Sequence, residues 1–170
     1  MGGAIARGLV NKNTLSASDI VVCDLGEDKL SELVIDCPGI NVSTDNVDAT
    51  RGTDVIVIAV KPWLVGVVLS GIASSIDYSR QTIVSIAAGV TIDELQAMTS
   101  PEASIFRLIP NTAISVGESM TFISHNKVAT VAQIDAVVAM FDTLGKASVI
   151  EERLMGAATA LCSCGIAYAM

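Results

Sequence analysis

Three residues that could contact a ligand each follow an apolar run: Lys61, Gly89 and Asn111. The runs span residues 54–60, 81–86 and 105–109. An apolar run without alternation is typical of a parallel strand that is buried on both faces. In open α/β sheets, ligands bind at the carboxyl ends of the strands, so these residues are candidates for one binding site. A surface lysine and turn-forming polar residues are the alternative interpretation.

A second candidate is an acidic residue, Asp24, at the end of the apolar segment 19–24. It follows Gly3 by about 20 residues, the offset at which an acid binds the ribose 2′-hydroxyl of NAD in dinucleotide-binding folds. A carboxylate at that place repels a 2′-phosphate, which favours NADH over NADPH as the cofactor. The alternative is a strand-end aspartate that begins a turn.

The first residues, from Met1 to Val10, are expected to form a helix that begins with two glycines and has no strand before it. In a dinucleotide-binding fold, a strand leads into a glycine-rich turn and then into a helix. We therefore expect this sequence to lack the first strand of the sheet. The chain also stops at Met170 within an apolar helical pattern, which indicates a second missing part.

The rest of the chain alternates predicted strands and helices. Expected helices begin near residues 27, 45, 62, 91, 128 and 151, and further short strands cover 41–43, 120–124 and 146–150. Such alternation predicts an α/β fold, a Rossmann-like doubly wound sheet that is mostly parallel, with right-handed crossovers. From residue 151 onward the chain is expected to be helical and carries almost no charge.

The composition excludes several classes of protein. The chain is 51% hydrophobic and 16% charged, which is typical of a packed globular domain. The net charge is −8 and no basic patch is present, so nucleic acid is not expected as a partner. An anionic cofactor can still bind, because the amides at helix N-termini carry local positive potential.

The cysteines and the histidine carry no recognisable site. The four cysteines are Cys23, Cys37, Cys162 and Cys164. Their spacing fits neither a C-x-x-C redox pair nor a zinc site, so we expect no metal and interpret them as small buried apolar residues in a reducing compartment. No signal peptide is visible, and the segment 154–170 is too rich in small and polar residues for a membrane span. We therefore predict a cytoplasmic protein without a membrane partner. His125 is expected to lie on the surface.

Four short motifs stand in a fixed order along the chain. They are Ala59-Val60-Lys61-Pro62, Ser85-Ile86-Ala87-Ala88-Gly89-Val90, Arg107-Leu108-Ile109-Pro110-Asn111-Thr112 and Ala167-Tyr168. Their order and spacing resemble those of the pyrroline-5-carboxylate reductase family, and Met1-Gly2 resembles the end of that family's glycine-rich turn. The resemblance covers all 170 residues. It implies an N-terminal nucleotide-binding domain at 1–150, followed at 151–170 by the first helix of an all-α dimerisation domain.

The resemblance also implies an activity. The family reduces Δ1-pyrroline-5-carboxylate to L-proline with NADPH or NADH, the last step of proline biosynthesis, as a homodimer or higher homo-oligomer. Hydride transfer to a protonated cyclic imine requires no covalent nucleophile, so the protein mainly positions the reactants. The family's proposed proton donor lies in the second domain, so the catalytic residue is unknown here. We expect the isolated chain to have little or no activity.

The family's binding residues transfer to this chain by position. The implied cofactor contacts are Gly2, Asn46, Ala59, Val60, Lys61, Pro62, Ala87, Ala88, Gly89 and Asn111, to which our own reasoning adds Asp24. The implied substrate contacts are Asn111, Thr112, Ser163, Cys164 and Gly165. In this assignment Gly2 lets the first helix present its N-terminus to the pyrophosphate. The segment 163–165 offers helix-start amides to the substrate carboxylate.

Two positions depart from the family pattern. The family usually has Ser-Gly-Ser-Gly-Pro-Ala-Tyr where residues 162–168 read Cys-Ser-Cys-Gly-Ile-Ala-Tyr. At Asp24 many members have a small polar or basic residue that suits NADPH. Two other functions are left open: another NAD(P)-dependent dehydrogenase, of the 3-hydroxyacid or arogenate type, and a catalytically inactive nucleotide-binding module.

Overall fold

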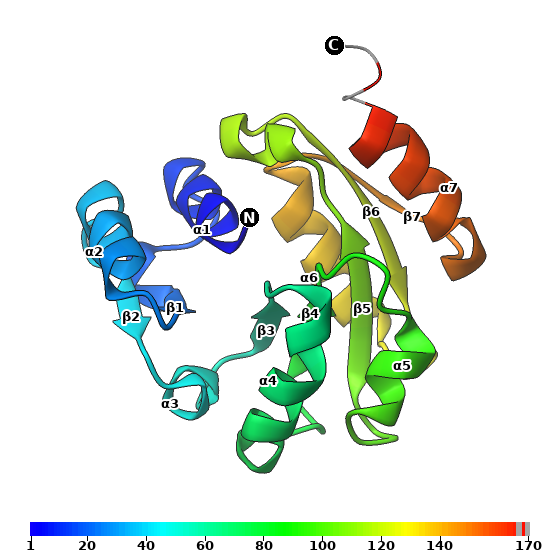
Figure 1. Ribbon diagram of the computed structural model, residues 1–170, viewed down its shortest axis with the longest axis horizontal. Helices are drawn as coiled ribbons and strands as arrows, with labels where there is room; N and C mark the ends of the chain where they lie inside the picture. The colour runs from blue at the N-terminus through cyan, green and yellow to red at the C-terminus, as the bar shows by residue number, and fades with distance from the viewer. Residues whose placement is uncertain (166–167, 169–170) are drawn as a thin grey trace.

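The computed structural model describes residues 1–165 and residue 168. Within these residues seven strands and seven α-helices follow one another, and Figure 1 labels them. The strands are β1 (Val21–Cys23), β2 (Asn41–Ser43), β3 (Val55–Ile58), β4 (Thr82–Ser85), β5 (Ser104–Ile109), β6 (Ser119–His125) and β7 (Gly145–Val149). The helices are α1 (Gly2–Asn11), α2 (Glu27–Asp36), α3 (Asn46–Thr50), α4 (Val65–Ile72), α5 (Ile92–Ala97), α6 (Val131–Asp142) and α7 (Met155–Ala158).

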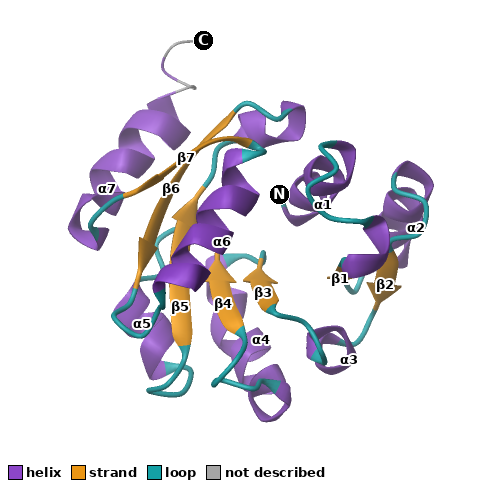
Figure 2. Cartoon of the chain, turned by 180° about the vertical axis from the view of Figure 1, so that it is seen from behind, coloured by secondary structure: helices purple, strands orange, loops and turns teal. Residues whose placement is uncertain are grey.

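The strands form two sheets. β1 and β2 pair in parallel, and the other five strands form a sheet of order β3-β4-β5-β6-β7. Within the described residues, no strand pairing joins β1 to β3, and Figure 2 shows the two sheets side by side. Every pair is parallel except β5 with β6, which is antiparallel. The predicted Rossmann-like, mostly parallel sheet is therefore confirmed.

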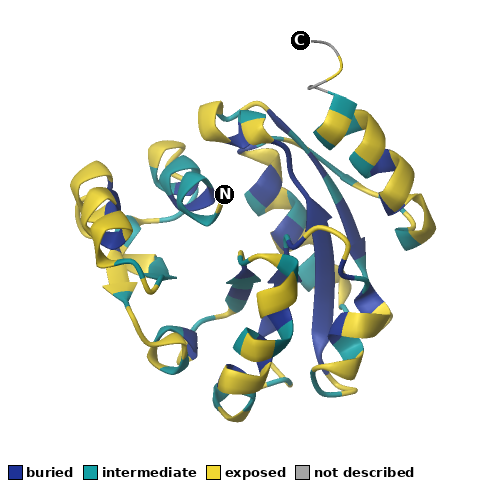
Figure 3. Ribbon diagram, in the orientation of Figure 1, coloured by how far each residue is buried: buried dark blue, intermediate teal, exposed yellow. Residues whose placement is uncertain are grey.

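Helices cover both faces of the five-stranded sheet. One core cluster joins α4 and α5 to β3, β4 and β5, with Leu69, Ile83 and Leu95 at its centre. A second cluster, on the opposite face, joins α1 and α6 to the same strands through Val84, Phe106 and other apolar residues. Figure 3 shows that β4 and β5 are buried, whereas β1 is half-buried and β2 is mostly exposed. Continuous apolar strands are what this two-sided cover requires.

Local sequence signals set several element boundaries. Helix α5 begins after Thr91, whose side chain forms a capping box with Glu94, as predicted from the threonine. Helix α6 begins later than expected, at Val131, because Thr130 forms the same box with Gln133. After Lys61 the chain first makes a 3-10 turn, η2 (Pro62–Leu64), before α4 starts. No helix in the described ranges has the length and apolarity to span a membrane.

The strict alternation of strand and helix that we expected is wrong between β5 and β6. Only a 3-10 segment, η4 (Thr112–Val116), separates them, and Gly117 then takes a left-handed conformation with φ of 72°. A parallel neighbour needs a crossover of a dozen or more residues, so this short connection can only return the chain in the antiparallel sense. The reversal puts β6 directly beside β5, with no covering helix between them in the sequence, and β7 then pairs with β6 at the edge of the sheet.

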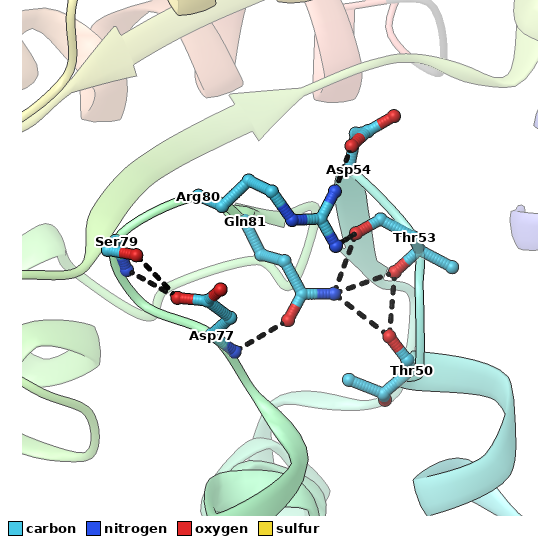
Figure 4. Close-up of polar contacts among 7 residues, drawn as sticks. All are labelled: Thr50, Thr53, Asp54, Asp77, Ser79, Arg80 and Gln81. Atoms are coloured by element: carbon cyan, nitrogen blue, oxygen red, sulfur yellow. Dashed lines mark hydrogen bonds and ion pairs between the residues drawn. The ribbon is translucent and has the colours of Figure 1, made fainter.

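A polar network lies at the edge of the sheet where β3 and β4 begin (Figure 4). The buried Gln81 side chain donates through Nε2 to the carbonyl oxygens of Thr50 at 2.9 Å and Thr53 at 2.7 Å. Its Oε1 accepts the Asp77 amide at 2.7 Å. Arg80 lies above this network and forms an ion pair with Asp54. Because its buried polar atoms are paired, the network fixes where both strands begin.

Candidate active site

The three predicted strand tips meet at one edge of the sheet. β3, β4 and β5 are adjacent and parallel, and Ile58, Ser85 and Arg107 are in register across them. The segments that follow these residues therefore leave the sheet at the same edge. Lys61, Gly89 and Asn111 stand within these segments, so the expected convergence on one edge is confirmed.

The tip of β3 lies against the start of α1. A Cβ atom added at Gly2 would lie 3.0 Å from the Cβ of Ala59, so only glycine lets the helix approach this closely. The first turn of α1 contains no acidic residue and no side chain that caps it. Its amides are therefore free to bind an anion at the helix N-terminus, as the pyrophosphate of a dinucleotide requires. The residues present thus fit such a cofactor.

Lys61 stands two residues beyond Ala59 on the same tip. Its backbone is extended, with φ of −63° and ψ of 147°, and its carbonyl accepts the Leu64 amide to open the 3-10 turn. The residue is exposed, and among the described residues its ammonium group has no hydrogen-bond or ion-pair partner. Val60 and Pro62 beside it are half-buried. The cation is therefore accessible to a ligand at this edge.

The tip of β4 offers backbone rather than side chains. Ala87 is buried, and its amide donates to the Ser85 hydroxyl at 3.3 Å. Ala88 and Gly89 are exposed, and Gly89 has φ of 80°, a conformation that favours glycine. Nothing lies within 4 Å of a Cβ built on Gly89, so the backbone angle, and not a lack of space, requires the glycine. A flat ligand can approach this small-residue turn closely.

Asn111, at the tip of β5, uses its side chain within the protein. Oδ1 accepts the Ala113 amide at 3.1 Å, and Nδ2 donates to the Cys162 carbonyl at 3.2 Å. Its backbone amide donates to the Ser119 hydroxyl. The buried side chain therefore bridges the sheet to the C-terminal helical segment. Thr112, the next residue, is exposed.

The expectation that residues 163–165 begin a helix is wrong. Ser163 and Cys164 lie inside a π-helical turn, η6 (Thr159–Cys164), that continues α7, and Gly165 is helical too. A proline at 166 would lack an amide and oppose such a helix, but this sequence has isoleucine there. Their contact with a substrate carboxylate stays a prediction. Ala167, part of the last family motif, lies outside the described residues.

An acidic residue also stands at the carboxyl end of a strand in the two-stranded β1–β2 sheet. Asp24 directly follows β1, and its Oδ1 accepts the Gly26 amide at 2.8 Å and lies 3.5 Å from the Lys29 ammonium. Burial raises the pKa of the neighbouring Cys23 thiol, and the charges of Asp45 and Asp24 raise it further. The carboxylates of Asp24 and Asp45 therefore both act on the Cys23 thiol. Their charges make the corner where β1 and β2 end electronegative. Asn46, the first residue of α3, directly follows Asp45 in the sequence, and its side chain is exposed.

Two cavities lie away from the strand tips. One, of about 210 Å³, is lined by Asp54, Arg80 and residues of α6 at the amino end of the sheet. The other, of about 390 Å³, lies between the ends of β6 and β7 and the 3-10 turn η5 (Glu152–Leu154). We place the candidate site at the strand tips because the accessible backbone turns, the open helix N-terminus and Lys61 meet there. No cluster of metal ligands is present in the described part of the chain.

Sequence reasoning missed one contact across the fold. Arg107 entered the sequence analysis only as part of a family motif, yet its Nη1 lies 3.0 Å from Oε1 of Glu152, a residue 45 positions later. An arginine inside a buried strand is itself a signal, because a buried charge needs a partner. Nothing in the local sequence identifies Glu152 as that partner.

These features define a class of protein: a Rossmann-like dinucleotide-binding domain with its ligand edge at the carboxyl ends of β3, β4 and β5. The model of the family described as "NADP oxidoreductase coenzyme F420-dependent" matches residues 1–89. The chain belongs to this family.

Named relatives and solved structures show which known proteins this chain is similar to. The chain is 33% identical over 168 residues to a pyrroline-5-carboxylate reductase of Methanosarcina acetivorans, covering 99% of this chain and 62% of that relative. The crystal structure of Plasmodium falciparum pyrroline carboxylate reductase with NADP bound matches with a TM-score of 0.88 at 30% identity, over 99% of this chain and 61% of that one. A pyrroline-5-carboxylate reductase from Coxiella burnetii matches with a TM-score of 0.92 at 26% identity, over 97% of this chain and 61% of that one. The resemblance read from the motifs is confirmed, and the chain spans about three fifths of these relatives.

Proposed function

We propose that this chain is the nucleotide-binding part of a reductase that converts Δ1-pyrroline-5-carboxylate to L-proline. The observation that carries the proposal is the meeting of the α1 N-terminus, Lys61 and the β4 and β5 tips at one sheet edge. Relatives named pyrroline-5-carboxylate reductase, matched over nearly the whole chain, support the same reaction. The complete site and a homodimer or higher homo-oligomer are proposed on the same resemblance, and a cytoplasmic location is proposed from the pattern of the four cysteines.

In this proposal each element has a physical task. The α1 amides bind the pyrophosphate of the cofactor, and Gly2 allows the helix to stand close to Ala59. Lys61 lies near the ribose on the nicotinamide side, where its ammonium group can pair with phosphate charge or donate a hydrogen bond to a ribose hydroxyl. The exposed turn at Ala88 and Gly89 lets the nicotinamide ring lie against the backbone. The bound nicotinamide cofactor supplies a hydride, and the chain holds the acceptor carbon of the imine beside it.

The proposed coenzyme preference is NADH. The family description names NADP and one solved relative binds NADP, so the family accommodates a 2′-phosphate. In this chain Asp24 and Asp45 both raise the pKa of Cys23 through their charges, which supports an electronegative corner where that phosphate would lie. Lys29, 3.5 Å from Asp24, offsets part of this field. We propose that the acidic charge dominates.

The test measures both binding and turnover. Reduced nucleotide should bind to the 170-residue chain, whereas reduction of pyrroline-5-carboxylate should need the product of the gene's complete reading frame. Lys61→Ala should weaken NADH binding about tenfold, because it removes a charge-assisted contact. Lys127→Ala, in an exposed turn before α6, is the matched control and should have no effect.

Each result bears on one part of the proposal. A complete protein that binds NADH but leaves pyrroline-5-carboxylate unreduced would contradict the assigned reaction. Equal loss of binding in both lysine variants would contradict the assigned site. Turnover by the 170-residue chain alone would contradict the expected need for a second domain.

A further inference from the structure

We infer that Arg107 and Glu152 are positioning residues, which fix the C-terminal helical segment along β5 and so set the distance between Thr112 and residues 163–165. The inference rests on the proposed function, because those are the proposed substrate contacts. It assigns a role to an ion pair that lies outside the cofactor edge.

Arg107 stands where the fold itself would favour an apolar residue. It lies in the middle of β5, a strand buried at every position, and only 10% of its side chain is exposed. Burying a guanidinium group costs free energy unless the group is paired. Its Nη1 meets Glu152, whereas its Nε is buried with no hydrogen-bond partner in the described structure. The pairing with Glu152 therefore offsets part of the free-energy cost of burying Arg107 in the strand.

Glu152 joins three elements through one oxygen. It lies in η5, just before α7, and its Oε1 accepts from Arg107 at 3.0 Å and from the Ile92 amide at 2.7 Å. Ile92 is the first residue of α5. The start of the C-terminal segment is therefore attached both to the central strand and to a helix of the covering layer. The other carboxylate beside Arg107 is Glu94, whose pKa is lowered chiefly by Thr91 and only slightly by Arg107.

A second attachment lies further along the same two elements. Asn111 donates to the Cys162 carbonyl, 51 residues away in the sequence. Arg107 and Asn111 are separated by about 13 Å of extended chain, and Glu152 and Cys162 by about 15 Å of helix. These lengths match, so the segment can lie along β5 with both contacts made, and Figure 1 shows α7 running beside the sheet.

The segment between the two contacts contains the π-helical turn Thr159–Cys164, and π-helical turns are rare within α-helices and recur at functional sites. Thr112 and residues 163–165 directly follow the two partners of the Asn111–Cys162 contact, so the Arg107–Glu152 pair acts on them from the other end of the segment. Loss of the Arg107–Glu152 pair would let the segment slide or rotate about the remaining contact at Asn111.

Hydrogen exchange of the 170-residue chain tests the attachment itself. Glu152→Ala should lower the protection of amides 155–164 on the order of tenfold, because it removes a charged acceptor of two hydrogen bonds. Glu152→Gln keeps an acceptor oxygen and should have a smaller effect. Glu151→Gln is the matched control, since Glu151 pairs only with the exposed Arg153. Unchanged protection in Glu152→Ala, or an equal loss in Glu151→Gln, would overturn the inference.

Kinetics of the complete protein test the positioning role. Glu152→Ala should raise KM for pyrroline-5-carboxylate and lower kcat, while Kd for NADH stays within about twofold, because the proposed cofactor contacts other than Asn111 lie on α1, at the β1–β2 corner and at the tips of β3 and β4. Glu152→Gln should restore part of the activity. A parallel rise in the Kd for NADH would show a general structural effect and refute positioning. If the unaltered protein does not reduce this substrate, the proposed function fails while hydrogen exchange still decides the attachment.

Discussion

Replacement of Asp24 by asparagine should shift nucleotide preference toward NADPH. The side chain is 40% exposed, so its charge acts through a medium between protein and water. At about 6 Å, two unit charges repel by about 0.7 kcal/mol in water and about 2.8 kcal/mol at an effective dielectric constant near 20. A 2′-phosphate carries more than one charge, whereas Lys29 offsets part of the field. We expect a net change of about 1.4 kcal/mol, which is about tenfold in the ratio of Kd for NADPH to Kd for NADH.

The asparagine keeps the structure while it removes the charge. Its side-chain oxygen can still accept the Gly26 amide, so the turn after β1 remains. Quenching or enhancement of the reduced nicotinamide fluorescence gives both dissociation constants, at low and at high salt. The change should shrink at high salt, because ions screen exposed charges.

Asp19→Asn is the matched control, since Asp19 precedes β1 and lies toward the opposite end of the strand. It removes the same charge from the protein but not from the candidate ribose position. An unchanged ratio in Asp24→Asn would refute the assignment of this acid to the ribose. An equal shift in Asp19→Asn would show that only the net charge matters.

Two further predictions concern stability and the acidic corner. Gly145→Ala should lower the free energy of unfolding, measured in urea titrations, by about 2–4 kcal/mol. The reason is that φ at Gly145 is 143° and the new Cβ would overlap the backbone of β6. Gly156→Ala, in open space on α7, is the control and should be neutral or slightly stabilising. Asp45→Asn should lower the pKa of Cys23, since it removes one of the charges that raise that pKa, and should speed alkylation of this thiol at fixed mildly alkaline pH. An unchanged rate would contradict the electrostatic coupling, and a stable Gly145→Ala protein would contradict the crowding at β6.

Local signals made part of the fold predictable. The start of the helix at residue 27 and the limits of the strand at 41–43 were predicted as observed, because apolar periodicity and the Pro-Gly turn at 38–39 define them within a few residues. The start of α5 followed from Thr91, an N-cap whose partner lies three residues away. The common edge of the strand tips followed from the parallel sense of adjacent strands. Each of these inferences depends on residues that are close in the sequence or on a general rule of sheet topology.

Contacts between distant segments were not predictable in the same way. The Arg107–Glu152 and Asn111–Cys162 contacts join residues 45 and 51 positions apart, and no periodicity encodes such pairs. The antiparallel sense of β6 depends on the short connection through η4, which the polar sequence did not distinguish from a crossover. The helix start expected at 163–165 came from a family motif whose proline this chain lacks.

The charges along the candidate edge explain how a chain of net charge −8 can host an anionic dinucleotide. The free amides of α1 and the unpaired Lys61 make the centre of the edge electropositive, while Asp24 and Asp45 make the β1–β2 corner electronegative. A pyrophosphate is favoured at the first place, and a ribose that bears only hydroxyls is favoured at the second. We expect this gradient to orient the proposed cofactor with its nicotinamide end toward β4 and β5, so that local potential, and not net charge, governs its binding.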